Sequence, residues 1–378
     1  MRTGIWRRGC RRWLLSGIAL GLCACGDDGN TQPRETYYLV SHGPTTDVGF
    51  WGEVFDAAEA VATRLGVDIE PLHPAVETTG AELNALMRQA VDARPAGIIA
   101  TIWGDGMPAE VMRANQADIP VAAINVYPDV ADYGPVALDG TAPPGKAGFL
   151  LYSGQNDADA ADEVARSLVC LGGAGAMYTD GSCGGTSVAD AWTALTNGAT
   201  VRAVCIIHQQ SAGVLTRCEA MKAVMNEVGL PAAQYEEITW NEAVPDAGKT
   251  AVQAYFADPA RADVDHFLVM SNGPNGAAAY LAADIAADVE AKIVIGTFDT
   301  SDAICDALTS GALRFASSQG HRDQAAMALA YLHHYVHGDR TLPEPGKAPD
   351  GSDDARWTTS ADNYRWYKTG PQLLTQCP

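Results

Sequence analysis

The sequence predicts an α/β protein of two lobes, in which each lobe is a parallel β-sheet flanked by helices. Short apolar runs of strand length alternate along the chain with longer amphipathic stretches, and this alternation is typical of βαβ units. The chain has 378 residues, which is more than a single hydrophobic core normally serves. An irregular stretch rich in Pro, Gly and Asp, Tyr127 to Lys146, interrupts the alternation, and we expect a boundary between the lobes there.

The predicted elements follow one another in a regular order. Tyr37 to Ser41 is a short apolar strand, and Val54 to Leu65 after it has apolar residues at helical spacing. Further amphipathic stretches lie at 80–94 and 243–258. Apolar runs with the length of buried strands lie at 97–102, 119–125, 202–207, 265–271 and 291–298. In parallel sheets of this kind ligands bind at the carboxyl ends of the strands, where Phe50 and Trp51 stand side by side in a helix's first turn.

The chain begins with the layout of a secretory signal. Five arginines precede WLLSGIALGLCAC, a run of 13 uncharged residues that ends in small side chains. A helix of that length is too short to span a bilayer, which takes about 20 residues. The stretch LCAC, Leu22 to Cys25, resembles the bacterial lipobox, in which the last cysteine is acylated and becomes the first residue of the mature protein. We therefore expect a lipid anchor on Cys25; a cleaved signal with a chance cysteine is the alternative.

The mature chain is strongly acidic. Residues 1–24 contain five arginines and no acidic residue, so their removal changes the formal net charge from −21 to −26. A field of this sign repels phosphate backbones, and nucleic-acid binding is not expected.

Eight stretches carry a family resemblance that runs from about Tyr37 to the C-terminus. They are VSHGPTTDVGFWGEVFDAA, GIIATIWGD, IPVAAIN, SGQNDADAADEVARSL, GVLTRCEAMKAV, VMSNGPNGAAAYLA, IGTFDTSDAICDALTSGALRFASSQGHRDQAAMALAYL and YKTGPQLLTQ. In this order they resemble the type 1 periplasmic binding proteins of sugar ABC transporters, the ribose-binding group. Repressors of the lactose-repressor family share that fold, but they carry an N-terminal helix-turn-helix where this chain has an export signal.

The resemblance implies two lobes joined by three hinge crossings, which close on a ligand at their interface. The expected organisation is a signal peptide with lipobox at 1–24, a tether at 25–35, an N-terminal lobe at 36–154 plus 320–342, and a C-terminal lobe at 155–319 plus 343–378.

The resemblance also implies aromatic contacts to a sugar ring. In the family two aromatics of the first strand-to-helix turn stack on the apolar face of the ring, and Phe50 and Trp51 match that place. Trp240 falls where the family often has an aromatic on the opposite side of the ring. Core packing is the alternative role for one member of the Phe50–Trp51 pair.

Four polar residues match ligand-binding positions of the family: Arg217, Asn272, Asp299 and Gln319. A guanidinium grips ring or hydroxyl oxygens, while a carboxylate and an amide at strand ends can each hold two hydroxyls. The alternatives are a solvent-facing helical arginine for Arg217 and helix N-caps for Asn272 and Asp299.

Four positions depart from the ribose-binding pattern. Asn125 and Val126 replace an Asp-Arg pair, Thr101 replaces an asparagine, and Trp103 adds an aromatic near the expected site. Ribose itself is therefore not favoured. A different pentose, a hexose, an inositol or a furanosyl signal such as autoinducer-2 stays open.

Nine cysteines divide between the N-terminal segment and the body of the chain. Cys10 and Cys23 lie in the signal, Cys25 is the anchor, and six remain. An even number in an exported chain indicates disulfides, and sequence alone allows about 15 pairings of six cysteines. The preferred pairing is sequential: Cys170–Cys183, Cys205–Cys218 and Cys305–Cys377. A structural zinc site is not expected, because no CxxC or CxH spacing occurs.

The histidines give no clear metal signal. His333 and His337 have the i, i+4 spacing that can hold a metal, but we expect a solvated helical face and no metal there. His42 and His208 follow strands and can edge the ligand site. No GxSxG elbow, HExxH or P-loop appears, so neither an enzyme nor a cofactor is expected.

The expected function is that of a lipid-anchored, monomeric binding protein of the periplasm or cell envelope, which captures a monosaccharide or polyol and delivers it to an ABC permease. Two alternatives stay open. One is a subunit that senses an autoinducer-like furanosyl ligand for a membrane receptor. The other is a nucleoside-binding lipoprotein, which would need hydrogen bonds to a base as well as to a ribose.

Overall fold

The computed structural model describes residues 34–45, 50–76, 80–129, 131–135, 144–208, 212–240 and 246–377. The chain divides into the units Met1–Arg34 and Glu35–Pro378, and all described helices and strands belong to the second unit. The predicted signal peptide and the anchor residue Cys25 lie outside the described residues. No helix in the described ranges is both long enough and apolar enough to cross a membrane.

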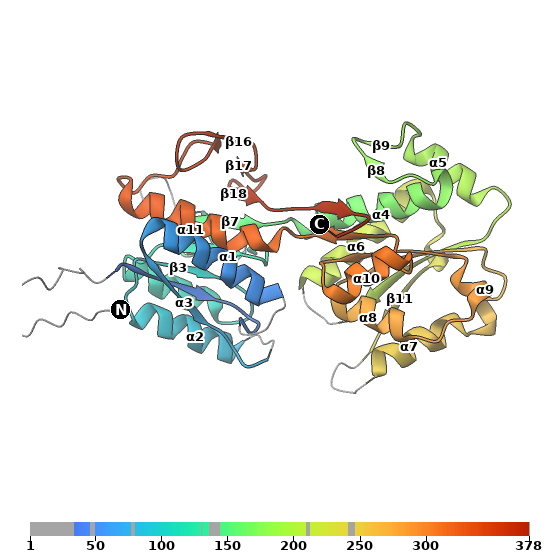
Figure 1. The fold of residues 1–378 in the computed structure, drawn as a ribbon, viewed down its shortest axis with the longest axis horizontal. Helices are drawn as coiled ribbons and strands as arrows, with labels where there is room; N and C mark the ends of the chain where they lie inside the picture. Colours follow the sequence, from blue (N-terminus) through green and yellow to red (C-terminus); the bar gives the residue numbers. More distant parts are fainter. Residues whose placement is uncertain are drawn as a thin grey trace, which may run out of the picture. The chain divides into compact units, whose positions relative to one another are not determined.

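The first lobe is built on a seven-stranded sheet (Figure 1). Its strand order is β17 (Trp357–Thr359), β18 (Arg365–Lys368), β7 (Leu151–Gly154), β4 (Val121–Ile124), β3 (Gly97–Ala100), β1 (Thr36–Val40) and β2 (Asp68–Leu72). All neighbouring strands are parallel except β17 and β18. Helices α1 (Phe50–Leu65) and α11 (His321–His337) pack on one face, and α2 (Ala81–Asp92) and α3 (Met107–Gln116) pack on the other.

The second lobe repeats this plan with six strands. The order is β11 (Tyr235–Thr239), β10 (Val201–Ile207), β12 (His266–Ser271), β13 (Ile293–Phe298), β14 (Phe315–Ser318) and β19 (Gln372–Leu374), and β19 alone is antiparallel. One face packs against α4 (Asp157–Ala174), α5 (Val188–Thr196) and α6 (Ala212–Val228). The other face packs against α7 (Ala247–Phe256), α8 (Pro274–Ala282), α9 (Ala287–Glu290) and α10 (Asp302–Ser310).

Three short strand pairs lie outside the two large sheets. They are β5 (Tyr133–Pro135) with β6 (Ala147–Phe149), β8 (Tyr178–Thr179) with β9 (Ser182–Cys183), and β15 (Gly346–Lys347) with β16 (Asp353–Asp354). Strand β5 falls in the stretch expected to be a lobe boundary, and β6 follows directly after that stretch. That expectation is wrong, because Tyr133, Ala147 and Phe149 are buried in the core of the first lobe.

The chain passes between the two sheets three times, as expected of this fold class. The crossings lie between β7 and α4, between β14 and α11, and between β18 and β19. Apart from the edge strand β17, the strand orders of the two sheets correspond one to one, so that β1, β3, β4 and β7 match β10, β12, β13 and β14. The carboxyl ends of matching strands therefore carry residues in equivalent positions.

The C-terminal tail departs from its expected place. Residues 343–378 were expected in the second lobe, but β17 and β18 join the first sheet and only β19 joins the second. The reason is aromatic burial. Trp357 is 1 % exposed and stacks on Tyr331 of α11 with ring centroids 4.1 Å apart, and the indole N–H of Trp366 donates to the Gly154 carbonyl at 2.8 Å.

Three disulfides are present, and they have the sequential pairing that the sequence favoured: Cys170–Cys183, Cys205–Cys218 and Cys305–Cys377. The first joins α4 to β9, and the second joins β10 to α6. The third joins α10 to the tail after β19, and so it ties the end of the chain to the second lobe.

Candidate ligand-binding site

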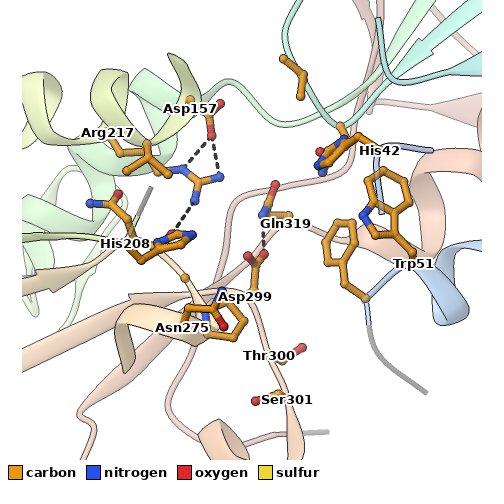
Figure 2. A pocket seen from close by; sticks show the side chains of 18 of the residues that line it. His42, Trp51, Asp157, His208, Arg217, Asn275, Asp299, Thr300, Ser301 and Gln319 are labelled. Carbon is orange, nitrogen blue, oxygen red and sulfur yellow. Dashed lines mark hydrogen bonds and ion pairs between the residues drawn. The ribbon is translucent and has the colours of Figure 1, made fainter. Parts of the chain in front are cut away.

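A cavity of about 570 Å³ lies at the carboxyl ends of strands from both sheets. Its lining includes eight of the ten residues that the sequence proposed for ligand binding: Phe50, Trp51, Trp103, Asn125, Arg217, Asn272, Asp299 and Gln319. The first four belong to the first lobe and the last four follow or pack on strands of the second. Figure 2 shows the charged and amide side chains that meet there.

The first lobe contributes an aromatic wall. Trp51 in the first turn of α1 is 7 % exposed, and Phe50 packs edge-to-face on it with centroids 5.1 Å apart. The His42 ring, two residues after β1, lies between Trp51 and Trp103 at centroid distances of 4.8 and 5.0 Å. The indole of Trp51 also covers Gly43 so closely that a Cβ there would be 2.3 Å from Trp51 Cδ1. Glycine at this turn is therefore required by packing.

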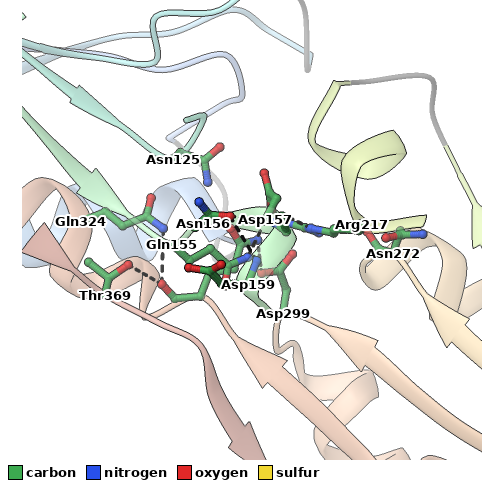
Figure 3. A network of polar contacts seen from close by, with 12 residues as sticks. Asn125, Gln155, Asn156, Asp157, Asp159, Arg217, Asn272, Asp299, Gln324 and Thr369 are labelled. Atoms are coloured by element: carbon green, nitrogen blue, oxygen red, sulfur yellow. Dashed lines mark hydrogen bonds and ion pairs between the residues drawn. The ribbon is translucent and has the colours of Figure 1, made fainter. Parts of the chain in front are cut away.

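The second lobe contributes a buried ion pair. Arg217 of α6 donates from Nε and Nη2 to Asp157 Oδ1 at 2.8 and 2.7 Å, and Asp157 opens helix α4 (Figures 2 and 3). The guanidinium also lies over the Phe298 ring, with Cζ 4.2 Å from its centroid. Only 8 % of the Arg217 side chain is exposed, so it is not the solvent-facing helical arginine of the alternative interpretation. The positive charge of Arg217 and the negative charge of Asp157 therefore balance each other at the cavity wall.

Asn272 immediately follows β12 and lies beside the Cys205–Cys218 disulfide. Its side chain is buried, and its amide donates to the Ile206 carbonyl at 3.1 Å and contacts the sulfurs of Cys205 and Cys218 at 2.9 and 3.1 Å. Among the described residues, Asn272 Oδ1 has no hydrogen-bond partner. Gly273, not Asn272, occupies the N-cap position of α8. The carbonyl oxygen is thus a candidate acceptor for a ligand.

Asp299 immediately follows β13, and Gln319 immediately follows the neighbouring strand β14. The Gln319 amide donates to the Asp299 carboxylate, and both side chains are buried (Figure 2). Burial raises the pKa of Asp299, although the nearby Arg217 and the Gln319 hydrogen bond act in the opposite direction. The N-cap of α10 is Ser301, whose hydroxyl accepts from the Ile304 N–H. Helix capping therefore does not explain Asp299.

The backbone of Gln319 connects the cavity to two crossings. The Gln319 carbonyl accepts hydrogen bonds from Thr369 Oγ1 at 2.6 Å and from Gln324 Nε2 at 3.5 Å. Next to it, Gly320 has a φ of 59°, and a Cβ there would be 2.0 Å from the Thr369 carbonyl oxygen. Two crossings thus approach each other at the residue that holds Asp299.

Two predicted ligand residues are absent from the described lining of this cavity. Thr101 is fully buried at the end of β3. Trp240 packs with the core cluster on the α7 side of the second sheet, where a Cβ on Gly248 would be 2.8 Å from its Cε2. The structure thus gives Trp240 a packing role beside α7.

Sequence reasoning missed several residues that line the cavity: Glu53, Asp157, Asn275, Thr300, Ser301 and Asp302. The signal was present for Asp157, which follows the first crossing in the stretch QNDADAADE and precedes a helical pattern. Glu53 lies one turn after Phe50 and contacts His321 Nε2 at 3.0 Å across to α11. His42 and His208 also line the cavity.

The family model described as periplasmic binding protein domain matches residues 40–340, and the chain belongs to this family. Its members bind substrates for transport and are not enzymes, and membership implies an extracytoplasmic location. No curated protein matches the sequence.

Solved structures of low sequence identity share the fold. A periplasmic sugar-binding protein of an ABC sugar transporter from Legionella pneumophila has 18 % identity and a TM-score of 0.62, over 82 % of this chain and 97 % of its own. A carbohydrate transporter protein from Acidothermus cellulolyticus 11B, in complex with myo-inositol, has 20 % identity and a TM-score of 0.59 over 90 % and 94 %. A solute-binding protein from Burkholderia graminis, in complex with D-arabinose, has 14 % identity and a TM-score of 0.63 over 90 % and 95 %.

Proposed function

We propose that the protein captures a neutral monosaccharide or a related polyol in this cavity by hinge closure and delivers it to an ABC permease. One observation carries the proposal. The aromatic wall of Phe50, Trp51 and Trp103 and the buried polar groups around Asp299 line the same cavity, although they belong to different lobes.

The two halves of the cavity suit the two sides of a sugar ring. The C–H face of a pyranose or furanose stacks on an aromatic face, and the stacking removes apolar area from water. The hydroxyls then donate to the Asp299 carboxylate through charge-assisted bonds and to Asn272 Oδ1. A missing hydroxyl would leave these buried groups unpaired, which is costly and makes the site selective.

The charge balance of the site supports a neutral ligand. Arg217 is already paired with Asp157, so its positive charge is not offered to a ligand carboxylate. Asp299 has an amide, Gln319, as its hydrogen-bond donor and adds a buried negative charge. An acidic sugar would bring a second carboxylate close to it, and this arrangement is unfavourable in a buried site. The inositol and arabinose complexes of the structural relatives support the choice of polyhydroxylated ligands.

A calorimetric panel tests the proposal. The protein is unfolded and refolded to remove any copurified ligand, and then titrated with pentoses, hexoses, inositols, sugar acids and nucleosides. We expect saturable binding of at least one neutral sugar or polyol and weaker binding of its acid. Binding restricted to nucleosides, or to sugar acids, would overturn the proposal. Uptake of the labelled ligand by cells with and without the gene separates transport from sensing.

We also propose that the mature protein is anchored through a lipid on Cys25. The support is the pattern of residues 1–25, in which an arginine-rich segment is followed by an uncharged run that ends in small residues. Cys25→Ser should abolish fatty-acid labelling and move the protein from the membrane fraction to the soluble fraction, because acyl chains supply the membrane affinity. Wild-type protein that takes up no labelled fatty acid would contradict the anchor, and Cys23→Ser is the matched control.

A further inference from the structure

Glu35, His333 and His337 form a cluster on the first lobe, outside the lining of the ligand cavity. Glu35 immediately precedes β1, whereas both histidines lie near the C-terminal end of α11. One ligand-type atom from each residue lies within 4.8 Å of the other two. His337 Nε2 is 2.8 Å and His333 Nδ1 is 3.7 Å from Glu35 Oε2. The fold thus adds a carboxylate to a histidine pair that the sequence alone left as a solvated face.

The separations suit a small divalent cation. Zinc bound tetrahedrally at about 2.0–2.1 Å from each ligand holds its ligand atoms about 3.3 Å apart. The two distances from Glu35 lie on either side of this value, and the two histidine nitrogens lie within 4.8 Å of each other, so modest side-chain adjustments would bring all three ligand atoms to one ion. Two imidazoles and a carboxylate are also the ligand set of zinc sites that keep a fourth position for water.

The surroundings support the ligands from a second layer. The hydroxyl of Tyr37 donates to Glu35 Oε2 at 3.1 Å and lies 3.2 Å from His333 Nδ1. Such outer hydrogen bonds orient the residues that hold a metal. The carbonyl end of α11 adds negative potential beside the histidines, which favours a cation. The His337 side chain is 55 % exposed, so solvent ions and a water ligand can reach the cluster.

We propose that Glu35, His333 and His337 bind one divalent cation of the zinc type. The ion links the residue that precedes the first strand of the fold to the last helix of the first lobe, across 302 positions of sequence between Glu35 and His337. Its effect is to stabilise the first lobe, because a cation that binds the folded state and not the dispersed ligands of the unfolded chain favours folding.

The competing explanation is an ordinary surface ion pair, in which a protonated His337 binds Glu35 without metal. Metal titration of the mature chain, prepared without an affinity tag and treated with chelator, separates the two. We expect one Zn²⁺ per chain in competition with a chromophoric chelator, a higher melting temperature with zinc, and a visible absorption band of tetrahedral type with Co²⁺.

Variants then assign the site. His337→Ala and Glu35→Gln should each lower zinc affinity at least tenfold and remove the zinc-dependent rise in melting temperature. His334→Ala is the matched control, because it changes a neighbouring histidine of α11 outside the cluster and should keep wild-type zinc affinity. If wild type binds no stoichiometric zinc, the ion-pair explanation holds and the proposal fails. Equal affinity in wild type, His337→Ala and Glu35→Gln would also overturn it, because the ion would then bind elsewhere.

Discussion

Among single residues, Asp299 has an environment that favours ligand contact over a structural role. It is buried, it immediately follows β13 with a φ of 65°, and it does not cap α10. A raised pKa in the folded state means that the fold disfavours the ionised carboxylate. Ionised Asp299 therefore lowers folding stability above its raised folded pKa; this cost shrinks as the pH falls through that pKa and is gone below the ordinary pKa of about 3.9.

The first prediction follows from this cost. Asp299→Asn should weaken sugar binding by about tenfold or more at pH 7, because it removes a charge-assisted acceptor. It should not lower the melting temperature of the ligand-free protein, because asparagine tolerates a positive φ and carries no charge. Calorimetry and thermal unfolding measure the two effects. Asp306→Asn, on an exposed position of the following helix α10, is the control; a less stable Asp299→Asn with normal binding would assign Asp299 a structural role.

The second prediction concerns pH. Binding by ionised Asp299 should weaken on acidification at pH values above about 3.9, because its folded pKa is raised from that ordinary value. Affinities measured in a series of decreasing pH should therefore fall in wild type and change less in Asp299→Asn. Any pH dependence that remains in the variant comes from other titrating groups, so the difference between the two profiles reports on Asp299. Identical pH profiles of affinity for both proteins would contradict the assignment.

The two adjacent aromatics should behave differently. Trp51 is nearly buried in the core cluster under α1, whereas Phe50 is only half-buried. Phe50→Ala should weaken binding with a small loss of stability. Trp51→Ala should weaken binding and also cost about 3–5 kcal/mol of unfolding free energy, the usual range for deleting a buried large aromatic. Denaturant unfolding and calorimetry on both variants test this third prediction, and equal stability losses would contradict the division of roles.

At the level of elements, two disulfides offer a matched comparison. Cys170–Cys183 and Cys205–Cys218 both join cysteines separated by 13 positions, so their effects on the entropy of the unfolded chain should be similar. The Cys205 and Cys218 sulfurs contact the amide of Asn272, which lines the cavity, and Cys218 is next to the cavity residue Arg217 in sequence.

The fourth prediction uses this match. Replacing both cysteines of either bridge by serine should lower the melting temperature in both cases. Loss of Cys205–Cys218 should also weaken sugar binding several-fold, because Asn272 and Arg217 lose a fixed support, whereas loss of Cys170–Cys183 should leave affinity unchanged. Calorimetry below the melting transition of each variant provides the measurement. An equal affinity loss in both pairs would point to general destabilisation.

Strand ends were the part of the site that sequence could predict. The chemistry at Asn125, Asn272 and Asp299 depends on where a strand stops, and apolar runs mark those places locally. The matched strands β4 and β13 illustrate this, because Asn125 and Asp299 follow them with the same φ of 65°. Trp240 shows what sequence could not predict. Its place after a strand was recognised, but the side to which its ring packs depends on Gly248 in the next helix, α7.

At the scale of the whole molecule, the alternation of strands and helices was enough to predict two parallel sheets. It was not enough to place the tail, because β17 and β18 are held by pairing and stacking with residues far away, such as Tyr331 and Gly154. The cluster of Glu35 with His333 and His337 was hidden for the same reason. Periodicity describes one segment at a time, whereas these contacts join segments from the two ends of the sequence.

The last prediction concerns the movement of the lobes. The cavity is lined from both sheets, and the three crossings are the covalent connections between them. A ligand that stacks on Phe50 and also binds Asp299 interacts with both lobes at once, so it should favour the closed arrangement by its differential affinity for that state. Small-angle X-ray scattering should therefore record a smaller radius of gyration with saturating sugar.

The Asp299→Ala variant tests whether this decrease depends on bridging. At a sugar concentration that saturates wild type, it should keep the radius of gyration of the ligand-free protein, because the ligand then lacks its main acceptor in the second lobe. Asp306→Ala should close like wild type. A wild-type protein that binds sugar with no change in scattering would contradict closure, and it would mean that the cavity holds its ligand without movement of the lobes.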